Sequence, residues 1–170
     1  MQIRDVRAGD EGRALGELLA RVYERLPGFP SPAEQPDYYA MLRDIVRFTE
    51  RPGTRVLVAL DNDGHLLGGV VYFADMAQYG SGGTATRERD ASGIRLLGVD
   101  PAHRGQGAGK ALTLHCIDLA RAAGHAQVIL HTTGAMKPAW SMYEALGFQR
   151  SDDLDFLQQD LAVFGFRLKL

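Results

Sequence analysis

The sequence predicts an α+β protein in which a mixed, mostly antiparallel sheet carries helices on both faces. Short apolar runs of strand-like composition alternate with longer segments whose apolar residues recur at helical spacing. Their order is strand, two helices, three strands, helix, strand, helix, two strands, which favours such a layered sheet. With 170 residues, no internal repeat and no tract of biased composition, the chain is expected to form one domain over residues 1–170.

The first third of the chain predicts one strand and two helices. The strand covers residues 2–6, and Asp10 caps a helix that runs to about Arg25. Prolines between Gly28 and Pro36 predict an extended linker, because proline removes a backbone donor and restricts the residue before it. The apolar faces of the helices carry Leu15, Leu18, Leu19, Val22 and Leu26 in the first and Tyr38, Met41, Leu42 and Ile45 in the second.

A β-hairpin is predicted from residues 54–60 and 66–73, because two apolar, β-branched runs flank the turn sequence Asp-Asn-Asp-Gly. The segment Gln78–Ser92 then breaks the pattern. It is rich in Gly, Ser and Thr, and Tyr79 is its only aromatic residue. Long loops in compact domains are often functional, and a plain connection is the alternative.

The rest of the chain alternates between strands and helices. The predicted elements are a strand over residues 94–99, a helix over about 107–123, a strand over 127–132, a helix from Pro138 to Gly147, and strands over 148–150 and 164–170.

The glycine-rich loop after the 94–99 strand is the most informative stretch. It carries glycines at the alternate positions 105, 107 and 109, which let the backbone approach a ligand that a Cβ would block. The first amides of the following helix lack intrahelical partners, and together with the helix dipole they favour an anion. The loop therefore predicts a site for a phosphate-bearing cofactor.

Two common phosphate loops do not fit this stretch. A Walker loop requires glycine where Arg104 stands and serine or threonine where Ala111 stands. The dinucleotide fingerprint requires its third glycine three residues after the second, whereas the spacing here is Gly-x-Gly-x-Gly. An NTPase and a Rossmann-type site are both excluded.

The loop resembles the acyl-CoA loop of the GNAT acetyltransferase superfamily. That loop reads Arg or Gln, two residues, Gly, one residue, then Gly or Ala, and Arg104, Gly107 and Gly109 fill these positions. The segment Ala139–Phe148 resembles a second signature, in which alanine is followed four residues later by tyrosine, here Tyr143, and then by Gly-Phe. The order of elements also resembles that fold over nearly the whole chain.

The resemblance implies an N-acetyltransferase that passes an acetyl group from acetyl-CoA to a primary amine by direct attack on the thioester, without a metal. It implies that pantetheine lies as a pseudo-strand beside the strand before the loop, and that the Tyr143 hydroxyl serves the leaving thiolate. The implied cofactor-binding residues are Leu97, Gly98 and Val99 for pantetheine and Arg104, Gly105, Gln106, Gly107, Ala108, Gly109 and Lys110 for the pyrophosphate.

The general base has no clear candidate. Some family members carry a glutamate near the position of Gly93, which cannot act as a base. The alternatives are Glu88, Asp90 and His131, and the last is more often a structural histidine at the end of a buried strand. Arg95 either faces the acceptor cleft, where it would bind an acidic substrate, or is paired on the surface.

Composition excludes several classes of partner. A net charge of −2 implies no broad basic surface for nucleic acid. The single cysteine, Cys116, excludes an internal disulfide and is expected in the core. No apolar run approaches a membrane span and the start is no signal peptide, so a cytoplasmic protein is expected. The expected acceptor is a small-molecule or peptide amine, and the resemblance leaves a homodimer open.

Other interpretations remain. A non-catalytic acyl-CoA-binding or regulatory module is favoured by Gly93 and by Met136, where many family members have asparagine. A nucleotide-binding protein without CoA is a weaker alternative. Tyr143 has a structural alternative as a half-buried aromatic residue with its hydroxyl at the rim.

Overall fold

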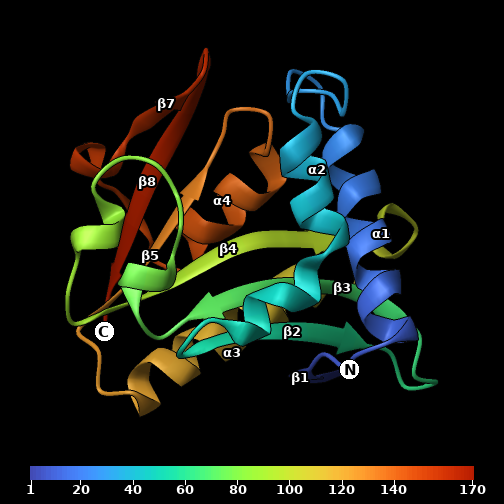
Figure 1. Ribbon diagram of the computed structural model, residues 1–170. Coiled ribbons are helices and arrows are strands. Elements are labelled where there is room, and N and C mark those ends of the chain that lie inside the picture. The colour runs from blue at the N-terminus through green and yellow to red at the C-terminus, as the bar shows by residue number, and fades with distance from the viewer.

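The computed structural model describes residues 1–170 and shows an eight-stranded open sheet (Figure 1). The strand order is β1-β2-β3-β4-β5-β8-β6, and β7 also pairs with β8. Every pair is antiparallel except β4 with β5, so the predicted mixed, mostly antiparallel sheet is confirmed. The strands are β1 Gln2–Asp5, β2 Thr54–Leu60, β3 Leu66–Phe73, β4 Ala91–Val99, β5 Gln127–Thr132, β6 Gln149–Arg150, β7 Phe156–Gln158 and β8 Leu161–Lys169.

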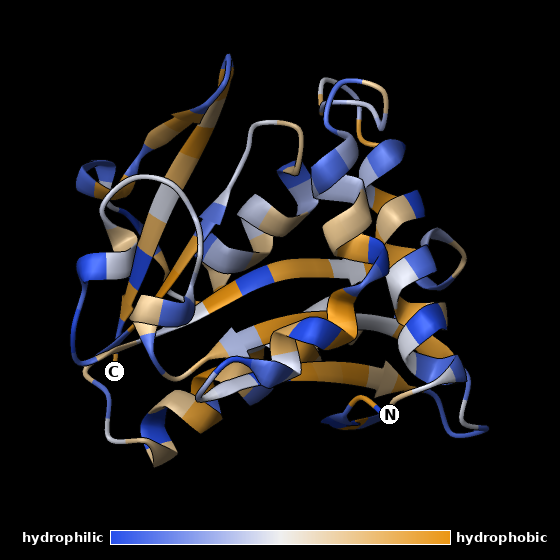
Figure 2. Ribbon diagram, in the orientation of Figure 1, coloured by the Kyte–Doolittle hydropathy of each residue, from blue (hydrophilic) through white to orange (hydrophobic).

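Helices cover both faces of the sheet, as predicted. The helices α1 (Asp10–Glu24) and α2 (Pro36–Arg43) pack on one face, and α3 (Ala108–Ala122) and α4 (Lys137–Ala145) pack on the other. The core is accordingly split into two apolar clusters, one on each side of the sheet. Figure 2 shows why: the central strands are apolar along much of their length, whereas α1 is apolar on one side and charged on the other.

The first helix illustrates how the sequence pattern leads to packing. Leu15 and Leu19 are fully buried, whereas Glu17 on the opposite side is exposed. Burial of each leucine stabilises the fold by about 1.5–3 kcal/mol. Gly16 lets α2 approach closely, because a Cβ there would lie 2.2 Å from the carbonyl oxygen of Arg43.

Three predicted details are wrong. Asp10 does not cap α1: Gly9 precedes the helix with a φ of 83°, and no side chain caps it. The strand before the glycine loop begins at Ala91 instead of Ile94. Ser92 and Gly93 give no apolar signal in the sequence, yet both are buried within the sheet. The last strand begins at Leu161 rather than Phe164. It forms a hairpin with the unpredicted β7, whose three residues are too few to give a periodic signal.

None of the helices combines the length and the apolar character needed to cross a membrane.

Cys116 is fully buried in the cluster under α3, as its position on the apolar face predicts.

Candidate active site at the split between β4 and β5

The parallel pair β4 and β5 separates halfway along its length. The two strands are paired from Ala91 with Gln127 to Ile94 with Leu130, and no further. Both continue, β4 to Val99 and β5 to Thr132, and Figure 1 shows β5 and β8 turned steeply away from β4. One edge of β4 beyond Ile94 therefore faces a gap instead of a neighbouring strand.

A β-bulge marks the point of separation. On the other edge of β4, Gly98 pairs with Gly69 and Arg95 pairs with Val71, so that Leu96 and Leu97 together stand opposite Val70. Leu96 has a φ of 61°, which is a strained conformation for a branched side chain. Such strain costs on the order of 1–3 kcal/mol and is typical of functional sites.

The alternation of the strand decides which backbone groups face the gap. The amide of Asp100 donates to the carbonyl of Leu67 at 2.8 Å, so Asp100 and, two residues earlier, Gly98 face β3. Leu97 and Val99 face the gap, and the hydroxyl of Tyr23 donates to the carbonyl of Leu97 at 3.0 Å. Gly98 instead allows α1 to pack, since a Cβ there would lie 2.6 Å from a methyl group of Leu19.

The glycine-rich loop leads from this edge into α3. Gly105 and Gly107 have φ values of 80° and 85°, and each lies in open space, so glycine is needed for the backbone conformation. The first helical hydrogen bond runs from Ala111 to the carbonyl of Gly107. The backbone amides from Arg104 to Lys110 have no hydrogen-bond acceptor in the protein.

The charged side chains of the loop are also free. Arg104 and Lys110 are exposed and form no ion pair. A row of unpaired amides at a helix N-terminus, with two free cations beside it, is suited to a pyrophosphate. The structure thus brings together the loop residues that the sequence predicted.

Tyr143 lies on α4, in the apolar cluster on the α3 side of the sheet. It is 5% exposed, and its ring packs edge-on against Phe148 at 5.8 Å between centroids. Its hydroxyl has no hydrogen-bond partner in the protein. Burial raises the pKa of Tyr143, with smaller contributions from Cys116 and Tyr79. The hydroxyl therefore stays protonated at neutral pH.

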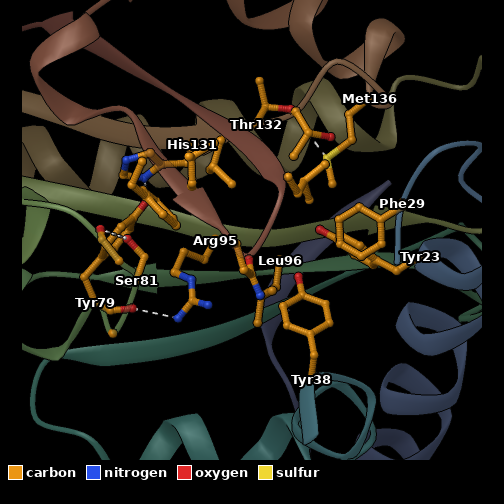
Figure 3. A pocket seen from close by; sticks show the side chains of 18 of the residues that line it. Tyr23, Phe29, Tyr38, Tyr79, Ser81, Arg95, Leu96, His131, Thr132 and Met136 are labelled. Carbon is orange, nitrogen blue, oxygen red and sulfur yellow. Dashed lines mark hydrogen bonds between the residues drawn. The ribbon is translucent and has the colours of Figure 1, made fainter. Parts of the chain in front are cut away.

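A cavity of about 410 Å³ lies beside the gap, on the face of α1 and α2 (Figure 3). That volume is typical of a site for a small molecule. The lining contains no aspartate or glutamate. It is formed by Tyr23, Phe29, Tyr38, Met41, the segment 79–82, Arg95, Leu96, residues 131–133, Met136, residues 156–158, Leu161 and Val163.

Phe29 of the proline-containing linker and the loop from Tyr79 onward contribute to this lining. Tyr79 is fully buried and holds the loop in place: its hydroxyl lies 2.8 Å from Nδ1 of His131. The other ring nitrogen, Nε2, donates to the carbonyl of Leu154 at 2.9 Å, so Nδ1 accepts from Tyr79. Both nitrogens of His131 are occupied, which matches the structural role considered for it.

The remaining base candidates are engaged elsewhere. Glu88 forms an ion pair with Arg167 at 2.7 Å, and the carboxylate of Asp90 accepts from the amide of Ala126 at 3.2 Å. At Gly93 a Cβ would lie 2.5 Å from the ring of Tyr79, so no glutamate fits there. None of these groups lines the cavity.

Sequence reasoning missed Tyr23 and the full role of Tyr79. Tyr23 sits on the predicted apolar face of α1, where nothing in the spacing distinguishes it from a core residue. Tyr79 is the single aromatic residue of a polar loop, and this contrast is the available signal for an anchor.

Comparisons with known proteins find acetyltransferases. The family described as "Acetyltransferase (GNAT) family" matches residues 18–148. A mycothiol acetyltransferase from Streptosporangium roseum is 44% identical over 59 residues, which are 35% of this chain and 18% of that protein. Human N-acetyltransferase 8B is 40% identical over 55 residues, which are 32% of this chain and 24% of that protein. The chain thus spans about a fifth of the length of such curated relatives.

Solved structures share the fold over the full length. A GNAT-family acetyltransferase from Staphylococcus aureus Mu50 superposes with a TM-score of 0.72 and 18% identity, covering 99% of each chain. The structure of yncA from Salmonella typhimurium with its cofactor acetyl-CoA gives a TM-score of 0.67 and 19% identity, covering 100% of this chain and 94% of that one.

Proposed function

Because the chain belongs to the GNAT acetyltransferase family, we propose that it transfers an acetyl group from acetyl-CoA to a primary amine by direct attack on the thioester. The observation that carries the proposal is the continuity between two unpaired backbone surfaces. The free edge of β4 beyond Ile94 runs directly into the loop whose amides lack acceptors from Arg104 to Lys110. A ligand with an amide-bearing arm and a pyrophosphate matches both.

The donor substrate is held mainly by backbone. The amides of residues 104–110 bind the pyrophosphate, and the side chains of Arg104 and Lys110 add about 0.3–1 kcal/mol each because they are exposed. Among the strand residues, Leu97 and Val99 pair with the pantetheine arm, and Gly98 supports the strand from the side of β3. Fixing the thioester beside the acceptor cavity supplies much of the catalysis through proximity.

Tyr143 serves the leaving thiolate as a hydrogen-bond donor. Its hydroxyl is unpaired in the protein, and its raised pKa keeps the proton in place over the working range. Complete proton transfer to a thiolate, whose ordinary pKa is about 8.5, would be uphill from such a group. We therefore assign Tyr143 to stabilisation of the developing charge, with the final proton coming from solvent.

The acceptor amine loses its proton to solvent. No carboxylate lines the cavity, and both nitrogens of His131 are hydrogen-bonded. At pH 7 the neutral fraction of an alkylamine with a pKa of about 10 is roughly one in a thousand, equivalent to about 4 kcal/mol. Transfer is thus expected to be slow at neutral pH and to accelerate as the pH rises.

The absence of a carboxylate from the cavity lining also favours the second candidate, a non-catalytic acyl-CoA-binding or regulatory module on the same fold. One experiment separates the two. Purified protein is incubated with acetyl-CoA and a panel of primary amines, and free thiol and acetylated product are measured by absorbance and mass spectrometry. Equal amounts of thiol and N-acetyl product support the enzyme, whereas binding of acetyl-CoA without product supports the module.

A further inference from the structure

Two arginines near the acceptor cavity have no acidic partner. Arg95 lines the cavity, and Arg51 lies close to Arg95 behind the cavity wall. Both guanidinium groups approach Gly80: a Cβ at that position would lie 2.8 Å from Nη1 of Arg51 and 3.4 Å from Nη1 of Arg95. Other partly buried arginines of this chain are paired: Arg4 with Glu11 and Arg150 with Asp155, both at 2.7 Å. Arg95 in the cavity wall and Arg51 directly behind the wall therefore carry positive charge that no acidic side chain of the protein pairs with.

The contacts of Arg95 fix its position without neutralising it. Its Nη1 donates to the carbonyl of Tyr79 at 2.7 Å, and its guanidinium lies 6.0 Å from the ring centroid of Phe48 and 5.8 Å from that of Tyr79. Figure 3 shows the guanidinium between Tyr79 and Tyr38 at one side of the cavity. A guanidinium held by one carbonyl keeps several N–H donors for a ligand.

Two hydroxyl groups of the lining also lack partners. The Tyr38 hydroxyl forms no hydrogen bond in the protein, and burial raises its pKa to about 12, so it remains a donor. Thr133, which is 4% exposed, has a buried Oγ1 with no partner. Buried polar atoms in native proteins are nearly always satisfied, so the buried, unpaired hydroxyl of Thr133 indicates a polar group on the ligand, and the Tyr38 hydroxyl offers a second free donor in the same lining.

The rest of the wall is apolar and aromatic. The rings of Tyr23, Phe29 and Tyr38 pack edge-on or tilted against one another, with ring centroids no more than 6.1 Å apart. With no acidic side chain in the lining, a polycationic acceptor would find no counter-charge. The cavity thus combines a cation, free donors and an aromatic surface.

We propose that the acceptor is a primary amine that also carries a carboxylate and an apolar body, that Arg95 binds its carboxylate, and that the aromatic wall binds the body. This inference rests on the proposed function and names the substrate class of the same site. The N–H donors of Arg95 pair with both carboxylate oxygens, which fixes the orientation of the acceptor relative to the thioester.

The test compares matched acceptors with and without the carboxylate. Acetyl transfer to L-phenylalanine and L-leucine is measured against transfer to the corresponding amides, in the wild type and in Arg95→Gln. Because a hydrogen bond to a charged group is worth about 1.5–3 kcal/mol, Arg95→Gln should lower kcat/KM for the acids by about 10- to 100-fold. For the amides, kcat/KM should change less than about threefold, because they lack the carboxylate that Arg95 binds.

Controls separate charge from folding. Arg47→Gln removes an exposed cation of the neighbouring segment and should leave all acceptors unchanged. Arg95→Lys keeps the charge and should recover only part of the activity on the acids, because lysine lacks the bidentate fork. The amide rates and an acetyl-CoA titration of Arg95→Gln show whether the variant is folded.

A binding measurement makes the test independent of turnover. N-acetyl-L-phenylalanine and its amide are titrated into the CoA-bound protein, and only the acid should bind, with affinity lost in Arg95→Gln. Failure of every carboxylate to bind or react, or equal losses on acids and amides, would overturn the inference. If amines without a carboxylate are acetylated efficiently, the proposed acetyltransferase function stands and the inference about the carboxylate is overturned. If no amine reacts and acetyl-CoA does not bind, the proposed function itself is contradicted.

Discussion

The hydroxyl of Tyr23 donates a hydrogen bond of 3.0 Å to the carbonyl of Leu97, and this contact joins α1 to β4 at the point where β4 parts from β5. The carbonyl faces the gap that we assign to pantetheine, and its second lone pair remains available. The contact therefore holds the edge of β4 in position while leaving an acceptor for a ligand.

Tyr23→Phe should remove this hydrogen bond without blocking the gap between β4 and β5. We expect the free energy of unfolding to fall by about 1 kcal/mol, the usual net worth of one hydrogen bond, as measured by urea denaturation. Acetyl-CoA affinity should stay within about threefold, because the carbonyl is still present. A loss of affinity of more than tenfold at unchanged stability would show that the hydroxyl itself contacts the donor substrate.

Tyr143→Phe should separate catalysis from binding. The hydroxyl has no partner in the protein, so its removal strands no other group and stability should change by less than about 0.5 kcal/mol. If the hydroxyl donates to the developing thiolate, kcat should fall by about 10- to 100-fold at a nearly constant Kd for acetyl-CoA. Unchanged turnover would return Tyr143 to the role of a packing residue.

The pH dependence of turnover should follow the acceptor and not the enzyme. Because solvent takes the amine proton, log(kcat/KM) should rise with slope one up to the pKa of the free amine. Two acceptors whose amine pKa values differ by two units should give profiles displaced by the same amount. A common inflection near neutrality with both acceptors would reveal a protein base.

Stability should depend on pH through His131. Burial lowers the pKa of His131 in the folded protein, and its Nδ1 accepts from Tyr79. Above about pH 6.5 the histidine is neutral in both states, so its contribution is complete. As the pH falls below that value, the unfolded chain takes up the proton first and stability is lost. Chemical denaturation between pH 7.5 and 5.5 should show a smaller loss in His131→Gln than in the wild type.

Periodicity and glycine spacing were enough to predict most of the fold and the position of the loop that we assign to the donor substrate. The α3 helix, the strand before it and the loop between them carry local signals, since their apolar spacing and glycine positions reflect backbone requirements. The split of β4 from β5 carries no such signal. It depends on the register of Leu96 and Leu97 against Val70, which only the paired strands define.

The acceptor half could not be predicted for a similar reason. Its lining comes from segments far apart in sequence, such as Phe29, Tyr79 and Phe156, and each is ordinary in its own context. Gly93 shows the limit most clearly. The family resemblance marks it as the position of a missing glutamate, whereas the structure fills the space beside it with the ring of Tyr79.

Calorimetric titration with acetyl-CoA tests the central claim, that the loop and the free edge of β4 form one binding surface for this donor. We predict saturable binding of one acetyl-CoA per chain, weakened severalfold in Arg104→Ala and Lys110→Ala, because each removes one charge beside the unpaired amides. Arg13→Ala, an exposed charge on α1, serves as the control and should bind as the wild type does. Absence of binding by folded wild-type protein would contradict the account.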